Sequence, residues 1–268
     1  MGQAVNINGK ELTSALTQLY APFDISLFIQ MVALSMEQKV GCLVIHGFGG
    51  SLKEVKPLKE ALEEHGYITK CPALKGHTGN KEDLKTVTYI DWISSAEEEL
   101  ICLKEECDEV FIAGFSMGGL IGMQLALKYE VEGLITINTP IYYWDVKKII
   151  ANIIHDLKSR DYSNIRRYLK PSNRLPIKAL WNFQKLLTRT KAIVPLIKVP
   201  VMVAQAIDDD VVQHRSAGYL YRNVGSDNKQ LATYARGGHV ILLSDMCGAI
   251  IKDVLTFLEA GTLHLKRA

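Results

Sequence analysis

Short apolar runs alternate with amphipathic stretches over residues 40–138, and this alternation restricts the possible folds more than any other feature. The runs at 40–45 and 109–114 are continuously apolar, as parallel strands covered on both faces require. Further strands are predicted at 67–71, 133–138, 201–206 and 231–235, and helices at 53–65, 89–106, 118–129, 214–222 and 247–259. The pattern predicts an α/β fold with a mostly parallel, doubly wound sheet.

The alternation stops between Pro140 and Pro195. That segment has helical periodicity, is rich in Lys and Arg, and contains no good strand. An insertion over one edge of the sheet accounts for it, and such insertions often form lids. We therefore predict one domain over residues 39–268 with a helical cap at about 140–195, preceded by an N-terminal extension over residues 1–38 whose role is left open.

Composition restricts the partners and the compartment. The net charge of +2 over 268 residues is too small to indicate a nucleic-acid partner. Five cysteines without a CxxC pair fit a reducing compartment. The first ten residues lack the features of a secretory signal, and the apolar stretch at 25–36 is shorter than the ~20 residues of a membrane helix. We expect a cytoplasmic protein with no stable membrane anchor, and leave its oligomeric state open.

One motif carries a candidate nucleophile. Gly114-Phe115-Ser116-Met117-Gly118 follows a predicted strand and precedes a predicted helix, which is the context of a nucleophile elbow. A serine in such a strained turn needs small neighbours, and glycines stand on both sides of this one. The alternative, a glycine-rich turn with a bystander serine, does not account for this context. Ser116 is the predicted nucleophile.

A second motif, His46-Gly47-Phe48-Gly49-Gly50, ends the first strand. Attack on an ester produces an oxyanion that needs preorganised N–H donors. In folds of this type one donor is the residue after the nucleophile, here Met117, and the other comes from the loop after an early strand, where Phe48 is the candidate. The motif lacks the spacing of a phosphate-binding loop, and we interpret His46 as a structural residue that binds loop backbone.

The general base and its acid are expected later in the chain. His239 follows Gly237-Gly238 between the last strand and the last helix, and we prefer it to its main rival, His77, which precedes the serine. The acid must follow a strand between nucleophile and base, where three aspartates stand together at 208–210. Only one of them can orient the imidazole, and spacing alone does not choose among them.

These segments resemble the small bacterial carboxylesterases and monoacylglycerol lipases of the α/β-hydrolase superfamily. The resemblance runs from about 41 to 259 and rests on VIHGFGG, LKGHTG, FIAGFSMGG, ITINTPIY, VPVMVAQAIDDDVV and ARGGHVILLS. It implies an α/β-hydrolase fold with a helical cap, nucleophile Ser116, base His239, and oxyanion donors Phe48 and Met117. It selects Asp209 as the acid, with Asp208 as the alternative. Residues 1–38 have no counterpart in the typical compact member.

The resemblance implies a serine hydrolase that cleaves small-molecule acyl esters with short- to medium-chain acyl groups and needs no cofactor or metal. A thioesterase, peptidase or acyltransferase with the same triad is the alternative, and a non-catalytic binding protein of the same fold is less favoured. Five residues at helical spacing are candidates to line the acyl pocket, with packing of the cap on the body as the equal alternative: Leu180, Trp181, Phe183, Leu186 and Leu187.

Overall fold

The computed structural model describes residues 38–143, 154–163 and 175–265. Its six strands form one sheet in which every neighbouring pair is parallel, in the order β2-β1-β3-β4-β5-β6. The strands are β1 (Val40–Ile45), β2 (Ile68–Lys70), β3 (Glu109–Phe115), β4 (Gly133–Ile137), β5 (Val201–Ala206) and β6 (Lys229–Tyr234). The prediction of a mostly parallel α/β sheet is confirmed.

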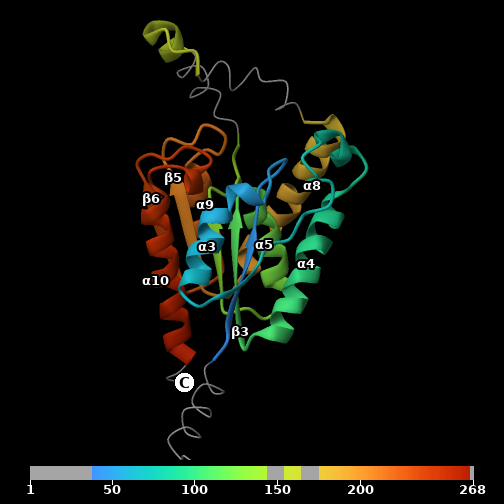
Figure 1. Ribbon diagram of the computed structural model, residues 1–268, viewed down its shortest axis with the longest axis vertical. Helices are drawn as coiled ribbons and strands as arrows, with labels where there is room; N and C mark the ends of the chain where they lie inside the picture. Colours follow the sequence, from blue (N-terminus) through green and yellow to red (C-terminus); the bar gives the residue numbers. More distant parts are fainter. Residues whose placement is uncertain (1–37, 144–153, 164–174, 266–268) are drawn as a thin grey trace, which may run out of the picture. The chain divides into compact units, whose positions relative to one another are not determined.

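Helices cover both faces of this sheet (Figure 1). They are α3 (Lys56–Glu64), α4 (Tyr89–Glu106), α5 (Met117–Lys128), α8 (Ile177–Ile193), α9 (Arg215–Asn223) and α10 (Cys247–Leu265). Buried side chains of α3 and α10 pack against one face, for example Leu58 and Val254. Those of α4, α5, α8 and α9 pack against the other, for example Leu100, Leu120 and Leu186. The two separate apolar clusters make the fold doubly wound.

The strand order places the end of β1 beside the end of β3. From β1 the chain passes through α3 to β2 on one side of β1, and from β2 it returns through α4 to β3 on the other side of β1. The loops after β1 and β3 therefore leave the sheet in different directions and open a crevice between them, which is where open α/β sheets bind ligands. The two glycine-rich motifs of the sequence occupy these two loops.

Most element boundaries agree with the sequence within two residues, and two helices differ by more. The helix predicted at 53–65 is interrupted: residues 52–54 form a 3-10 turn, and α3 starts at Lys56 with a proline at its beginning, where the missing N–H has no intrahelical acceptor to lose. The last helix extends to Leu265 rather than 259. Residues 1–37 of the predicted N-terminal extension and residues 144–153 and 164–174 of the predicted cap lie outside the described residues.

Candidate active site

Ser116 occupies a sharp turn between β3 and α5. Its φ of 52° and ψ of −119° lie outside the usual regions for an L residue, so the backbone is strained there. The turn is held because the Ser116 N–H donates to the Ile137 carbonyl at 2.8 Å. This conformation presents the side chain at the start of α5, where the first N–H groups of the helix have no intrahelical acceptor.

The flanking glycines are sterically required. A Cβ at Gly114 would lie 2.4 Å from the backbone of Gly118, and a Cβ at Gly118 would lie 2.2 Å from the Ile45 carbonyl oxygen. Both distances are far below van der Waals contact. The expectation that the turn tolerates only small neighbours is confirmed, and the glycines allow α5 to start directly against the end of β1.

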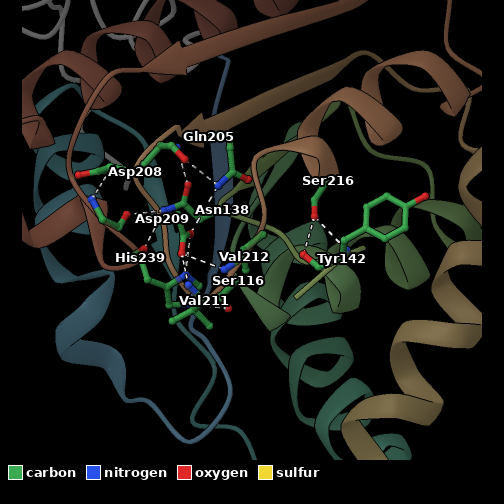
Figure 2. Close-up of polar contacts among 12 residues, drawn as sticks. Ser116, Asn138, Tyr142, Gln205, Asp208, Asp209, Val211, Val212, Ser216 and His239 are labelled. Atoms are coloured by element: carbon green, nitrogen blue, oxygen red, sulfur yellow. Dashed lines mark hydrogen bonds and ion pairs between the residues drawn. The ribbon is translucent and has the colours of Figure 1, made fainter. Parts of the chain in front are cut away.

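Three of the predicted side chains lie in a hydrogen-bonded series. His239 Nε2 is 3.0 Å from Ser116 Oγ, and His239 Nδ1 is 2.8 Å from Asp209 Oδ2 (Figure 2). The second carboxylate oxygen of Asp209 accepts the N–H groups of Val211 and Val212 at 2.8 and 2.9 Å. Asp209 is fully buried, so these hydrogen bonds hold its carboxylate in place without contact with solvent. His77, the rival candidate for the base, takes no part in this series.

The structure separates the two candidate acids. Asp208 accepts the N–H groups of Gly237 and Gly238 at 3.2 and 2.8 Å, so it binds the backbone before His239 and not its ring (Figure 2). Both glycines have positive φ, 128° and 61°, which L side chains seldom adopt. The two neighbouring carboxylates therefore have different roles: Asp209 contacts the imidazole of His239, and Asp208 binds the backbone of the loop that carries His239.

The loop after β1 is held from several sides. The buried His46 ring places Nδ1 2.9 Å from the Gly47 carbonyl, to which it must donate, and burial lowers the pKa of His46 and keeps the ring neutral. The Gly50 N–H donates to the same carbonyl at 3.3 Å. Because a trans peptide directs its C=O and N–H to opposite sides, these bonds also orient the Phe48 N–H. No described residue accepts that N–H.

A cavity of about 170 Å³ lies next to the serine. It is lined by Phe48, Ser116, Pro140, Tyr143, Leu175, Leu180, Phe183, Val211, Val212 and His239. The Phe48 ring stacks on that of Phe183 at 5.1 Å, and Tyr143 meets the same ring edge-on at 5.7 Å. Apart from the serine, the histidine and one tyrosine, the lining is apolar, which suits a hydrocarbon chain rather than a charged group.

The five cap residues predicted for the pocket divide into three groups. Leu180 and Phe183 line the cavity. Leu186 and Leu187 instead pack into the core beneath α8, and Trp181 is 68% exposed on the outer side of the helix. A helix turns 100° per residue, so a run of apolar residues covers more than one face. Leu180 and Phe183 therefore line the cavity beside the serine, Leu186 and Leu187 follow the alternative of packing on the body, and Trp181 does neither.

Two further residues reach the site without having been predicted. Asn138, fully buried at the end of β4, donates to the carbonyls of Gly238 and His239. Glu54 Oε2 accepts the Gly47 N–H at 3.3 Å, and burial raises the pKa of its carboxyl. The position of Asn138 at a strand end offered a signal, since the carboxyl ends of parallel strands meet at one edge. A charged residue within a predicted amphipathic helix, such as Glu54, offered none.

His77 lies under the loop after β1. Its ring is edge-on to those of His46 and Trp92, at 5.1 and 5.8 Å. Its Nε2 atom is buried and has no hydrogen-bond partner among the described residues. Burial, with a smaller contribution from His46, lowers the pKa of His77 to about 4. The folded protein therefore keeps this ring neutral over a range in which a free histidine takes up a proton.

Acidification is expected to weaken folding through His77. Between pH 6.5 and about 4 the unfolded chain binds a proton at this residue and the folded chain does not, so stability falls as pH falls. We expect the free energy of unfolding to drop by about 3 kcal/mol more in the wild type than in His77→Gln. Urea unfolding across this pH range measures the difference. His65→Gln, at an exposed histidine, should retain the wild-type slope, and equal slopes in wild type and His77→Gln would contradict the prediction.

Within the described residues, no group of three or more His, Cys, Asp and Glu side chains is arranged to hold a metal ion. No helix in the same residues is both long and apolar enough to cross a membrane.

Comparison with known proteins finds relatives that match most of the chain. The chain is 30% identical over 232 residues to a thermostable monoacylglycerol lipase of Bacillus sp. (strain H-257), covering 81% of this chain and 90% of that protein. It is 28% identical over 224 residues to a carboxylesterase of Bacillus subtilis (strain 168), covering 81% and 91%. A soluble variant of monoglyceride lipase from Saccharomyces cerevisiae has a similar fold, with a TM-score of 0.65 at 20% identity over 84% of this chain and 88% of that one.

The model of the alpha/beta hydrolase family matches residues 42–252. This match begins in β1 and ends in α10, so it includes every strand of the sheet except the first two residues of β1. It also includes the elbow serine, the three aspartates after β5 and the histidine before the last helix. From its sheet topology, its strained serine turn and this match, the chain belongs to the alpha/beta hydrolase family.

Proposed function

We propose that this protein hydrolyses carboxylic esters through an acyl-enzyme on Ser116. The observation that carries the proposal is the series from Ser116 through His239 to Asp209 at the edge of an apolar cavity. A base within 3.0 Å of the hydroxyl is in reach of its proton. A carboxylate on the other ring nitrogen holds the tautomer that leaves Nε2 free to accept that proton.

The first half of the reaction forms the acyl-enzyme. Ser116 Oγ attacks the ester carbon while His239 Nε2 takes its proton, and the carbonyl electron pair moves to oxygen. The N–H groups of Phe48 and Met117 stabilise that oxyanion. When the tetrahedral species collapses, the bond to the alcohol oxygen breaks and the alcohol leaves with the proton from His239.

The second half releases the acid. A water molecule gives its proton to His239 as its oxygen attacks the acyl carbon, and the resulting oxyanion lies against the same two N–H groups. Collapse breaks the bond to Ser116 Oγ, which takes the proton back from Nε2. Asp209 remains ionised throughout and stabilises the imidazolium that forms twice per turnover. The protein requires no cofactor for these steps.

Cavity size and composition support a short- to medium-chain acyl group as the part of the substrate that is buried. A cavity of about 170 Å³ with apolar walls fits such a chain. One curated relative is named a monoacylglycerol lipase and another a carboxylesterase, so we propose acyl esters of small alcohols, glycerol included, as the substrate class.

The segment at about 140–195 is proposed as the cap of this pocket, and residues 1–38 as a separate extension. Five free cysteines support a cytoplasmic location.

Hydrolysis of p-nitrophenyl esters from acetate to palmitate, with and without a serine-reactive phosphonate, tests the proposal. We expect turnover that the phosphonate abolishes and that peaks at a short or medium chain length. Acyl-CoA thioesters and peptides are assayed in parallel. Turnover confined to either of these would assign a different acyl bond, and absence of both turnover and labelling would refute the proposed chemistry.

A variant of the cavity wall should change the preferred chain length. Leu180→Ala removes three carbon atoms from the wall, so the ratio of kcat/KM for longer over shorter esters is expected to rise about tenfold. Trp181→Ala is the matched control, since the neighbouring side chain is 68% exposed and lies outside the cavity lining. An unchanged profile in Leu180→Ala, or the same shift in both variants, would exclude this cavity as the acyl pocket.

A further inference from the structure

Asn138 uses its whole side-chain amide inside the site. Its Nδ2 atom donates to the carbonyl oxygens of Gly238 and His239 at 3.0 and 2.7 Å, and its Oδ1 atom accepts the Ala206 N–H at 2.8 Å (Figure 2). Because Asn138 is fully buried, water cannot replace these bonds if the amide is removed. One side chain therefore links the loop that carries His239 to the end of β5, which precedes the aspartates.

The backbone around Asn138 is tied to the remaining parts of the site. The Asn138 N–H donates to the Ala204 carbonyl at 2.9 Å, and the carbonyl of the preceding residue, Ile137, accepts the Ser116 N–H at 2.8 Å. The segments that carry the nucleophile, the acid and the base are thus all hydrogen-bonded to Ile137, the last residue of β4, or to Asn138, which follows it. No other described residue hydrogen-bonds through its side chain to the His239 carbonyl.

The backbone conformation favours an asparagine here. Asn138 has a φ of 45°, in the left-handed region that asparagine adopts more readily than most other non-glycine residues. This conformation ends the strand and turns the side chain back across the sheet edge, toward β5 and the histidine loop. A longer or β-branched residue would be strained in this conformation and would not offer two donors and an acceptor at the same place.

The loop that carries His239 needs such an anchor. Two glycines precede the histidine, and their positive φ values, 128° and 61°, belong to residues with much conformational freedom. Asp208 holds the N–H groups of these glycines, but the carbonyls of Gly238 and His239 depend on Asn138. Without the amide, two partly buried carbonyls lose their donor and the loop is free to move away from Ser116.

We propose that Asn138 is a positioning residue for the base: its amide sets the height of His239 above the nucleophile and so maintains the 3.0 Å approach of Nε2 to Ser116 Oγ. This inference rests on the proposed ester hydrolysis by Ser116. It predicts a role in proton transfer rather than in substrate binding, since Asn138 is absent from the cavity lining.

Asn138→Gly tests the proposal, because glycine accepts a φ of 45° without strain and only the side chain is lost. We expect kcat for a p-nitrophenyl ester to fall about 100-fold, the effect of a misplacement of about 1 Å, with little change in KM. Phosphonate labelling of Ser116 should slow in parallel. The low-field proton resonance of the hydrogen bond from His239 to Asp209 should shift or broaden.

Asn182→Ala is the matched control. Asn182 is also buried and also makes three side-chain hydrogen bonds, to Tyr89, Val87 and Lys178, but it joins α8 to α4 away from His239. It should lower the melting temperature while kcat and the low-field resonance stay as in the wild type. If Asn138→Gly behaves like this control, the positioning role is wrong. If the wild type itself hydrolyses no ester, the proposed function fails instead.

Discussion

Ser116→Ala is expected to reduce kcat for ester hydrolysis by about 10⁶-fold, the loss typical of removing the nucleophile from a serine triad. Alanine has no oxygen to attack the ester carbon, and neither the proposed oxyanion donors nor the cavity can replace it. The fold should persist, since His239 is the only hydrogen-bond partner of Ser116 Oγ among the described residues. Alanine tolerates the φ of 52° no worse than serine.

The measurement for this variant combines turnover, phosphonate labelling followed by mass spectrometry, and thermal unfolding. Ser216→Ala is the matched control: Ser216 is fully buried and its hydroxyl bonds both backbone groups of Tyr142, apart from the histidine (Figure 2). The control should lose about 1–3 kcal/mol of stability and retain most of the turnover. Turnover in Ser116→Ala near that of the wild type would refute the assignment of the nucleophile.

Asp209→Asn is expected to reduce kcat by about 10⁴-fold. An asparagine oxygen can still accept the N–H groups of Val211 and Val212, which leaves the amide NH₂ facing His239 Nδ1. That nitrogen must then accept rather than donate, and the proton moves to Nε2. A protonated Nε2 cannot take the proton of Ser116, so geometry is retained while the base is lost.

Asp208→Asn is the control that the sequence provides one residue away. Asp208 accepts backbone N–H groups of Gly237 and Gly238 and does not contact the imidazole, and an asparagine oxygen can still accept one of them. A much smaller loss of kcat is expected than in Asp209→Asn, from a less firmly held loop. Pre-steady-state measurements of the acylation rate compare the two variants. A larger loss of rate in Asp208→Asn than in Asp209→Asn would mean that Asp208, and not Asp209, is the acid that orients His239.

Local patterns were sufficient for most of the fold and for part of the site. Continuous apolar strands, amphipathic helices and the proline at the start of α3 act within a few residues of one another, so the sequence reports them directly. The same holds for the glycines around Ser116, whose necessity follows from the clash of a Cβ with adjacent backbone. The strand-to-helix context of this motif indicated the nucleophile before any tertiary contact was known.

Other assignments depended on directions in space that a linear pattern does not contain. The aspartates at 208–210 have the same chemistry and neighbouring positions, and only the path of the chain after β5 aims Asp209 at the imidazole and Asp208 at the loop backbone. The rotation of α8 about its axis likewise separates Leu180, in the cavity, from Trp181, in solvent.

The sequence by itself therefore determined the doubly wound sheet, the elbow serine and the histidine before the last helix, because each is specified by local backbone geometry and hydrophobic periodicity. Residue spacing left the acid open and only the family resemblance favoured Asp209, whereas the tertiary structure shows which carboxylate contacts His239, which residues of α8 line the cavity, and that Asn138 joins the segments carrying Ser116, Asp209 and His239. These outcomes depend on the meeting of strand ends more than sixty residues apart in the chain, where hydrogen-bond direction, rather than residue type or spacing, selects the partner.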